Sequence, residues 1–254
     1  MEVLSFLGIV VGVGALLLGN VLEGGQLSAI LNPIAFMIVI GGTMGAVMVH
    51  TPTKIFLKSL GAFPRVFFPP KLKAELVVKQ FMVMARACKK DGSLQAGNYE
   101  NNFDDAFIRK AIKMLADNAE VDLIEDILHR DIDLEERNHR LHAEVYKSMG
   151  GYSPTIGLVG AILGLINVMS YLDSPSQLGH GLAVAFTATL YGVSFANLVF
   201  IPVAEKLTIL SEREANFRDM VVAGVVSIRS GESLSTTESR LRSYLDDRLA
   251  SGWN

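Results

Sequence analysis

The chain has 254 residues, of which 50% are hydrophobic, and its formal net charge is −3 at pH 7. This charge excludes the strongly basic surface typical of nucleic-acid-binding proteins, and a single cysteine excludes an internal disulfide and a cysteine metal cage. The mean hydropathy of +0.36 is high for a soluble protein, and the apolar residues occur in blocks, which is the pattern of a membrane protein.

Two membrane helices are predicted near the N-terminus, over residues 3–22 and 31–49. A bilayer is crossed by about 20 apolar residues, and Pro52 ends the second helix because proline cannot continue its hydrogen-bond ladder. The first run is longer than the apolar part of a signal peptide and lacks a basic segment before it, so we expect this helix to be retained.

The composition changes after residue 50, and residues 51–151 predict a small helical domain. Residues 72–90 carry apolar side chains at steps of three and four, which indicates an amphipathic helix. Two more helices are expected over residues 103–116 and from about 122 to 142 or beyond, the latter capped by Asp122.

The most informative stretch is residues 152–205, which predicts two further membrane helices. The apolar runs 152–172 and 181–204 contain no Asp, Glu, Lys, Arg or His, and a polar turn around Asp173 separates them. Residues 204–229 are predicted to leave the membrane as a helix, and residues 239–249 to form a short amphipathic helix in the cytoplasmic tail 206–254. Its apolar stretch 220–226 is too short to span a bilayer, so it is expected to pack against the soluble helices.

The distribution of Lys and Arg predicts the orientation. Residues 51–151 hold sixteen of these side chains and residues 206–254 hold the other seven, whereas the loops at 23–26 and 173–180 hold none. Because cytoplasmic loops are enriched in Lys and Arg, both soluble parts and both termini are expected in the cytoplasm. The division is therefore a transmembrane hairpin (1–50), a cytoplasmic domain (51–151), a second hairpin (152–205) and a cytoplasmic tail (206–254).

A stripe of small residues runs along the third membrane helix at i, i+3, i+4 and i+7: Gly157, Gly160, Ala161 and Gly164. Such a stripe lets helices approach closely. Two readings are open: a close helix contact, or a surface that borders a narrow polar path or lets a guest helix pass.

Five polar side chains fall within eleven residues of the fourth membrane helix: Thr187, Thr189, Tyr191, Ser194 and Asn197. Single Ser and Thr residues bond their own helix backbone and carry little information. A group of five indicates that these side chains line the interior of a helix bundle, because polar groups in hydrocarbon face a bundle interior or water.

The sequence shows no catalytic set. No phosphate-binding loop or nucleophile set stands out, and His139 and His142 share a helix face with no third ligand at metal spacing. We therefore expect no enzymatic activity, metal or cofactor. An ion crossing hydrocarbon needs a carboxylate relay, and the four predicted spans contain none, so a partner helix is expected to supply it.

Three segments carry a resemblance to a known family: residues 153–165, 183–192 and 195–206. They resemble the flagellar stator A-subunit family, MotA and PomA, within the MotA/TolQ/ExbB group, and the resemblance covers nearly the whole chain. It implies an all-α inner-membrane protein with four spans and a helical cytoplasmic domain. It also implies a pentamer around two copies of a MotB-like B-subunit that carries the membrane aspartate. Ion flow would then turn the pentamer and push the flagellar rotor.

The resemblance also implies roles for single residues in the membrane. Pro154 and Pro202 match two family prolines at the cytoplasmic ends of the third and fourth helices. Ala161 stands where sodium-driven members have a threonine, which favours protons as the driving ion. Thr189 matches a threonine present in both types.

Rotor contact in the family uses charged cytoplasmic residues, and the interacting protein would be a FliG-like switch protein. Lys89 and Lys90 match the family's basic pair, following Arg86, and Glu100 matches one acidic position. Another family glutamate falls on Gly97, where this chain departs from the pattern.

Other functions are open at this point. An ExbB/TolQ-like energiser of envelope transport shares the group, but those relatives have three spans, and the first hairpin here argues against it. A sodium-driven stator is a second alternative. A small transporter would need internal repeats or broken helices, which the sequence does not show.

Overall fold

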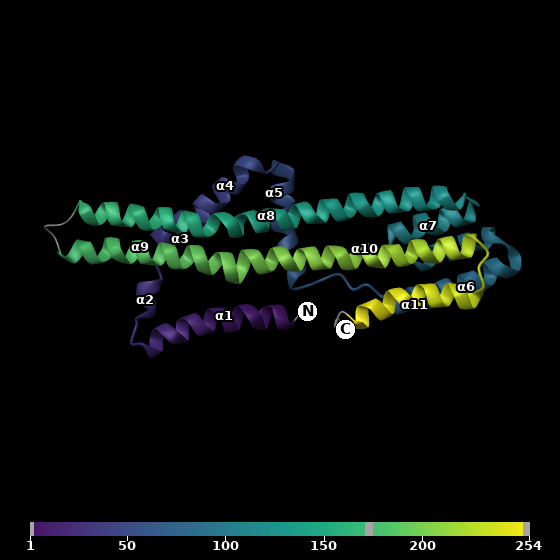
Figure 1. The fold of residues 1–254 in the computed structure, drawn as a ribbon, viewed down its shortest axis with the longest axis horizontal. Helices are drawn as coiled ribbons and strands as arrows, with labels where there is room; N and C mark the ends of the chain where they lie inside the picture. The colour runs from purple at the N-terminus through teal and green to yellow at the C-terminus, as the bar shows by residue number, and fades with distance from the viewer. Residues whose placement is uncertain (1–2, 171–174, 251–254) are drawn as a thin grey trace. The chain divides into compact units, whose positions relative to one another are not determined.

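The computed structural model describes residues 3–170 and 175–250, so the turn expected around Asp173 lies outside the described residues. Within them the elements are helices, with no strand (Figure 1). The chain forms two compact units, residues 1–70 with 139–209 and residues 71–138 with 210–254. The membrane boundaries predicted at 50, 151 and 205 stay predictions.

The first unit begins with α1, Val3–Leu22, as predicted. The second membrane helix starts earlier than expected, with a short turn, α2, at Leu27–Ile30. It continues through three consecutive segments: α3 (Pro33–Phe36), a π-helical turn (Met37–Gly41) and α4 (Gly42–His50). Asn32 caps α3, because its side-chain oxygen accepts from the backbone N–H groups of Ile34 and Ala35 at 3.1 Å each.

The third membrane helix is not separate from the helix before it. Both belong to α8, Val121–Met169, which has 49 residues and contains Pro154. Asp122 lies in the first turn of α8 and not before it, so the predicted cap is wrong. Gly150 and Gly151, beside the predicted boundary at residue 151, continue the helix.

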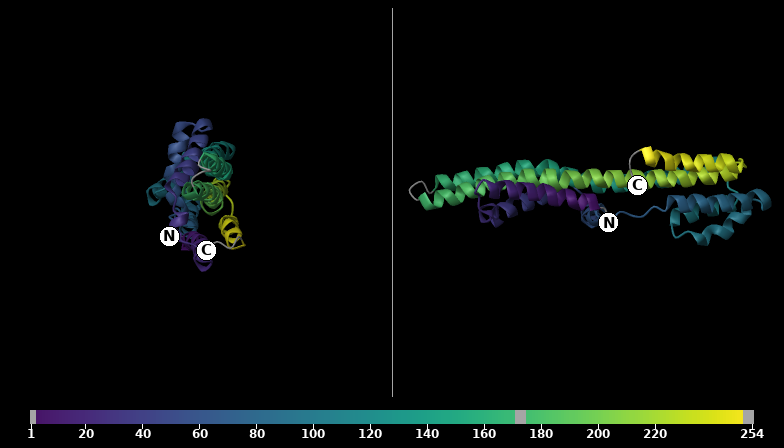
Figure 2. Two further views of the ribbon diagram at one scale, coloured as in Figure 1. Left: turned by 90° about the vertical axis from the view of Figure 1, so that its left-hand side faces the viewer. Right: turned by 90° about the horizontal axis from the view of Figure 1, so that it is seen from below.

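The fourth membrane helix consists of α9 (Pro175–Phe195), a π-helical turn (Ala196–Phe200) and α10 (Ile201–Arg229). Figure 2 shows α8 and α9 side by side. Pro202 lies two residues after the end of the π-helical turn, and proline has no N–H to give to the carbonyl four residues earlier. The π-helical turn therefore lies where proline already removes one backbone hydrogen bond of the α-helix.

A helix that the sequence does not indicate, α5, spans Thr53–Ala62, and a 3-10 turn, Phe63–Val66, follows it. Phe56 and Ala62 of α5 are buried in a cluster with α8 and α10 residues, including Tyr146, Met149 and Val203. The Tyr146 hydroxyl donates to the Ser59 carbonyl at 3.0 Å. These contacts fix α5 to the first unit.

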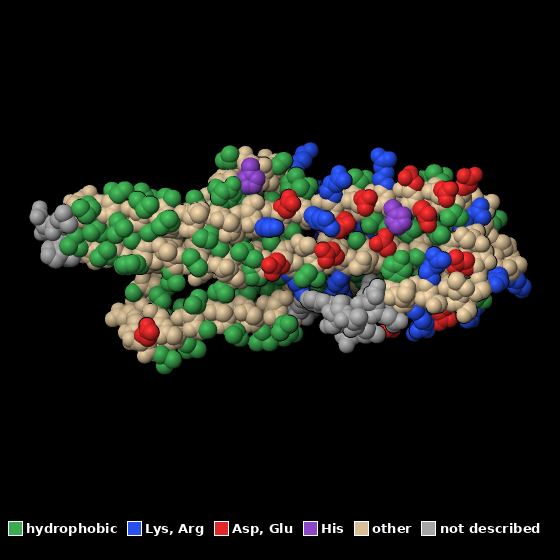
Figure 3. All heavy atoms as spheres, viewed as in Figure 1, with side chains coloured by type: hydrophobic (Ala, Val, Ile, Leu, Met, Phe, Trp, Pro, Cys, Tyr) green, Lys and Arg blue, Asp and Glu red, His purple; other side chains and the backbone are tan. Residues whose placement is uncertain are grey.

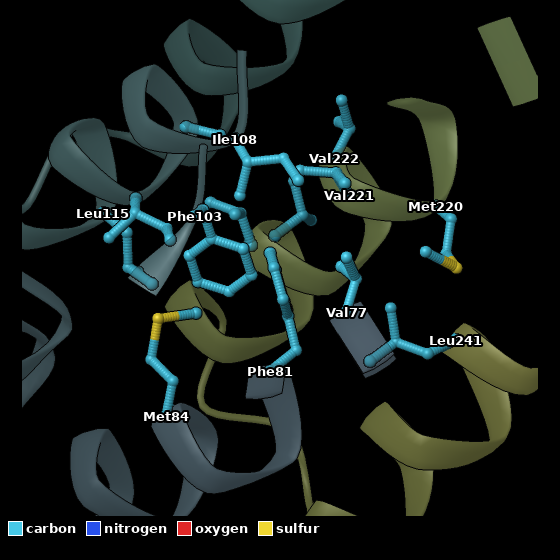
Figure 4. Close-up of a cluster of buried hydrophobic side chains, with 14 of the residues drawn as sticks. Val77, Phe81, Met84, Phe103, Ile108, Leu115, Met220, Val221, Val222 and Leu241 are labelled. Carbon is cyan, nitrogen blue, oxygen red and sulfur yellow. The ribbon is translucent and has the colours of Figure 1, made fainter. Parts of the chain in front are cut away.

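The second unit contains α6 (Ala74–Asp91), a 3-10 segment (Ser93–Asn102), α7 (Ala106–Ala116) and α11 (Leu234–Ala250), with parts of α8 and α10. Figure 4 shows its core, in which Phe81 and Phe103 meet edge to face with ring centroids 5.8 Å apart. Met220, Val221 and Val225 of α10 are fully buried there, which confirms that stretch 220–226 packs against the soluble helices.

Four of the described helices are long and apolar enough to cross a membrane: Val3–Leu22, Leu27–His50, Val121–Met169 and Gly181–Arg229. Hydrophobic side chains cover α1 and α9 in Figure 3, without Lys, Arg, Asp or Glu on the face of α9 that is shown. The all-α, four-span fold class predicted from the sequence is confirmed.

Candidate functional site

The small-residue stripe of α8 packs against α9 of the same chain. A Cβ atom built on Gly157 would lie 2.8 Å from the Ala188 carbonyl oxygen and 3.0 Å from Gly192 Cα. One built on Gly192 would lie 2.7 Å from the Ser153 carbonyl oxygen. Because these neighbours are backbone atoms, only glycine fits at this crossing.

The same contact continues along the stripe. A Cβ at Gly160 would lie 2.7 Å from Ala188 Cβ, and one at Gly164 would lie 2.8 Å from the Ala185 backbone nitrogen. Ala161 is half-buried. The three glycines thus form a close helix contact within one chain, and Ala161 is the stripe's remaining partly exposed member.

Ser153 is a functional candidate that the sequence patterns do not single out. Its side chain is fully buried, and its hydroxyl donates to the Gly192 carbonyl at 2.9 Å. This bond joins α8 to α9 one turn before Gly157. The serine stands directly before Pro154. A small polar residue next to a proline in a membrane helix is the sequence signal that could have pointed to it.

The hydroxyl groups of α9 mostly bond their own helix. Thr187 donates to the Ala183 carbonyl at 2.6 Å and Thr189 to the Ala185 carbonyl at 3.2 Å. The Asn197 amide donates to the Val193 carbonyl at 2.9 Å. Thr187 is buried, Ser194 is half-buried, and Thr189 and Asn197 are exposed on the single chain. The predicted set therefore does not line one enclosed interior within this chain.

Tyr191 fastens the fourth membrane helix to the first hairpin. Its hydroxyl donates to the Ile30 carbonyl at 2.6 Å and accepts from the Asn32 N–H at 3.2 Å. Its ring also meets Phe36 edge-on, with centroids 6.3 Å apart, and Phe195 with centroids 6.0 Å apart. Tyr191 is thus a structural tie between segments 161 residues apart.

Thr43 is a second polar residue that the sequence patterns do not single out. It follows the π-helical turn of the second span, is fully buried, and its hydroxyl has no hydrogen-bond partner within residues 3–170 and 175–250. Buried hydroxyls are nearly always bonded, and π-helical turns recur at functional sites. The Gly41-Gly42-Thr43 sequence marks this position only as a place of close packing.

The two prolines lie in different helical surroundings. Pro154 is half-buried inside α8, and Pro202 is exposed at the second position of α10. Near them α8 and α10 meet closely, since a Cβ on Gly150 would lie 2.6 Å from Ile201 Cγ1.

The candidate rotor residues all belong to the second unit. Arg86, Lys89 and Lys90 are exposed near the C-terminal end of α6, and Glu100 is half-buried in the 3-10 segment that follows. Lys89 also lines a cavity of about 370 Å³ between α6, α10 and α11. Basic side chains suit a helix C-terminus, where the backbone carbonyls give a partial negative charge, so helix stability alone also accounts for basic residues at this position.

A group of cationic side chains lies where α5 packs on α8. Arg65 Nη1 is 3.2 Å from His139 Nε2, and the rings of His139 and His142 have centroids 6.3 Å apart. Burial lowers the pKa of His142, and the nearby charges of His139, Lys58 and Arg65 lower it further. Burial also raises the pKa of Tyr146 to about 12.

Profiles of two protein families match the chain. The MotA/TolQ/ExbB proton channel family matches residues 99–220, and the motility protein A N-terminal region matches residues 6–93. Motility protein A of Bacillus subtilis is 34% identical over 98% of this chain and 93% of its own length. Chemotaxis protein PomA of Vibrio alginolyticus is 28% identical over 97% of this chain and 96% of its own.

Solved structures agree with these matches over the same length. The structure of C. jejuni MotAB has a TM-score of 0.91 with 26% identity and covers 96% of both chains. The flagellar MotAB stator complex from Bacillus subtilis has a TM-score of 0.87 with 33% identity and covers 96% of this chain and 97% of that one. The chain belongs to the flagellar motor stator A-subunit family, within the MotA/TolQ/ExbB proton channel family.

Proposed function

We propose that this chain, together with a MotB-like B-subunit, conducts protons down their gradient and converts the flow into torque on the flagellar rotor. The observation that carries the proposal is the match of 96% of the chain to solved MotAB stator complexes. The family is one of ion-channel subunits and not of enzymes.

The partner follows from what the spans lack. Residues 152–172 and 181–204 carry no charged side chain, and ion transfer through hydrocarbon needs an ionisable relay. A B-subunit helix with an aspartate supplies that group. The solved relatives are complexes named MotAB, which supports a B-subunit partner. The proposal further assigns a pentamer of this chain around two B-subunits in the bacterial inner membrane.

The first hairpin favours a stator over an ExbB/TolQ-like energiser. The motility protein A N-terminal profile covers residues 6–93, which include most of α1 and all of α4. The proposed ion-path and helix-packing residues form one set: Pro154, Gly157, Gly160, Ala161, Gly164, Thr187, Thr189, Tyr191, Ser194, Asn197 and Pro202.

The experiment is deletion of the chain with separate measurement of filament assembly and swimming. We expect normal filaments, no swimming, and recovery when the chain is supplied together with its B-subunit. Normal swimming in a strain without a second stator set would overturn the proposal.

The inference about which ion drives the motor rests on Ala161. An alanine methyl group offers no oxygen to a sodium ion, so we infer proton drive. Swimming speed is expected to fall with a proton uncoupler and to persist when sodium is removed. A speed that follows sodium and survives the uncoupler would assign the chain to sodium-driven stators instead.

A further inference from the structure

Helix α5 is held at the boundary between the apolar and charged parts of the first unit. Its buried side chains Phe56 and Ala62 pack on Tyr146 and Met149 of α8. The apolar run of α8 begins at residue 152, so α5 contacts α8 within about two turns of that start. Since α4 ends at His50, only Thr51 and Pro52 separate α5 from the second span.

The exposed side of α5 has one apolar and one basic edge. Leu57 is 62% exposed and Leu60 is 38% exposed, and residues three apart lie along one edge of a helix. Lys54 and Lys58, four residues apart, are exposed along the other. Neither lysine has an ion-pair partner within the described part of the chain. Figure 3 shows hydrophobic and basic side chains side by side over α5.

Further positive charge lies close to the basic edge. Lys58 and Arg65 are near enough to His142 for their charges to act on it, and Arg65 touches His139. A surface that joins exposed leucines to unneutralised lysines suits the zone of a bilayer where acyl chains meet headgroups. A neighbouring protein that covered the leucines would need an acidic partner for each lysine that it desolvated.

We propose that α5 is a lipid-binding strip that selects anionic phospholipids, with Leu57 and Leu60 in the acyl region and Lys54 and Lys58 on the phosphodiester groups. Each lysine near an anionic membrane surface is expected to favour anionic over zwitterionic lipid by about fivefold. The strip is independent of torque generation and requires only that the chain lies in the membrane.

The test places a tryptophan on the strip. Leu57→Trp is made with Trp253→Phe, so that one tryptophan remains in this chain, and the complex with its B-subunit is placed in vesicles. The B-subunit's own tryptophans are replaced, or the same complex carrying Trp253→Phe and Leu57 serves as the fluorescence blank. Brominated phosphatidylglycerol or brominated phosphatidylcholine is then titrated over the same range of mole fraction. We expect quenching by both lipids, and quenching by the anionic lipid at severalfold lower mole fraction.

Paired variants separate headgroup recognition from insertion. Lys54→Gln with Lys58→Gln is expected to keep the quenching and remove the preference, whereas Lys54→Arg with Lys58→Arg keeps both. Lys79→Gln with Lys113→Gln, two exposed lysines of α6 and α7, removes the same charge elsewhere and is expected to change neither. Leu60→Trp repeats the measurement if Leu57→Trp does not assemble.

Three results would overturn the proposal. The absence of quenching by either lipid means that protein covers the strip. Equal quenching by the two lipids with both lysines present means that there is no headgroup recognition. Loss of the preference in millimolar inorganic phosphate at constant ionic strength means that the lysines bind a free anion and not a lipid.

Discussion

The contact of Gly157 with Gly192 is a close approach of backbone to backbone between α8 and α9. A Cβ on Gly192 would meet the Ser153 carbonyl oxygen at 2.7 Å and Gly157 Cα at 3.0 Å, and backbone atoms cannot move aside as a side chain can. We expect Gly192→Ala to destabilise the helix pair by about 1–3 kcal/mol. The apparent melting temperature of the solubilised complex should fall by roughly 2–10 °C.

The control for this substitution is Gly45→Ala in α4, where a Cβ would meet nothing within 4 Å. This variant adds the same methyl group to a membrane helix without a clash, so its melting temperature should stay close to that of the wild type. If the two substitutions changed the melting temperature equally, the crossing of α8 and α9 would have space for a methyl group at Gly192, contrary to the structure.

His142 makes stability depend on pH. Its pKa is lowered by burial and by His139, Lys58 and Arg65, so the unfolded chain takes up the proton first as the pH falls. Stability is therefore greatest above about pH 6.5, the ordinary histidine value, and declines until the pH reaches the lowered pKa. We expect His142→Gln to reduce the loss of melting temperature between pH 7.5 and 5.5.

The matched control is His50→Gln, which changes an exposed histidine outside this cationic group. It should keep the wild-type pH dependence. A His142→Gln variant whose melting temperature changes with pH as steeply as the wild type would contradict the prediction.

Among the elements, the C-terminal end of α6 carries the basic pair that is predicted to contact the rotor. Lys89 and Lys90 are exposed there, and the resemblance predicts them as the family's basic pair. We expect Lys89→Glu with Lys90→Glu to reduce swimming torque strongly while leaving membrane insertion and B-subunit binding intact. A tethered-cell torque measurement, with copurification of the B-subunit, checks both parts.

Lys79→Glu is the control on the same helix, since it reverses one exposed charge ten or more residues earlier. It is expected to swim as the wild type does. If both variants lost torque equally, general charge on α6 would matter and not the basic end.

The helices of the chain differ in how far their sequences predict them. The sequence predicts α1 to the residue, because a charge-free apolar run ends at Glu23 and Gly24. It does not predict the union of two expected helices in α8, since Gly150, Gly151 and Pro154 are usually helix breakers. Their neighbours compensate, because Gly150 lies against Ile201 and Ser153 bonds the Gly192 carbonyl.

The sequence does not predict α5 for a related reason. Its ten residues are too few to show a clear helical repeat of apolar side chains. Three prolines also follow within the next eight positions, at 64, 69 and 70. The helix depends on tertiary contacts with Tyr146 and Met149, which local sequence does not contain.

For the whole molecule, the asymmetry of Lys and Arg predicts both loops at 23–26 and 173–180 outside the cytoplasm. The only cysteine, Cys88, is buried, and burial raises the pKa of its thiol, so it reacts slowly with maleimides. We expect a membrane-impermeant maleimide to label Glu23→Cys in cells with a permeable outer layer. Lys113→Cys should be labelled only after the inner membrane is opened.

The wild-type chain is the control and should stay unlabelled in both conditions. Labelling of Lys113→Cys in cells with an intact inner membrane would reverse the predicted orientation.

The candidate site is only partly readable from the sequence. The spacing of Gly157, Gly160 and Gly164 predicts a small-residue surface but leaves open what it faces, and the structure gives α9 of the same chain. Tyr191 groups by spacing with the polar lining, yet its hydroxyl bonds Ile30. The spacing of residues predicts which of them share a helix face. It does not predict a hydrogen bond between residues 161 positions apart, because the tertiary fold determines that contact.

That bond between Tyr191 and Ile30 has a consequence for synthesis. The ribosome makes Ile30 long before Tyr191, and at about 5–20 residues per second the interval of 161 residues lasts roughly 8–32 s. During this time the first hairpin is in the membrane without its tyrosine, and the Ile30 carbonyl and Asn32 N–H must find other partners. The first hairpin therefore gains these two hydrogen bonds only when the fourth span is complete. A chain truncated before Tyr191 leaves the Ile30 carbonyl and the Asn32 N–H without this partner, a defect that quality control can recognise.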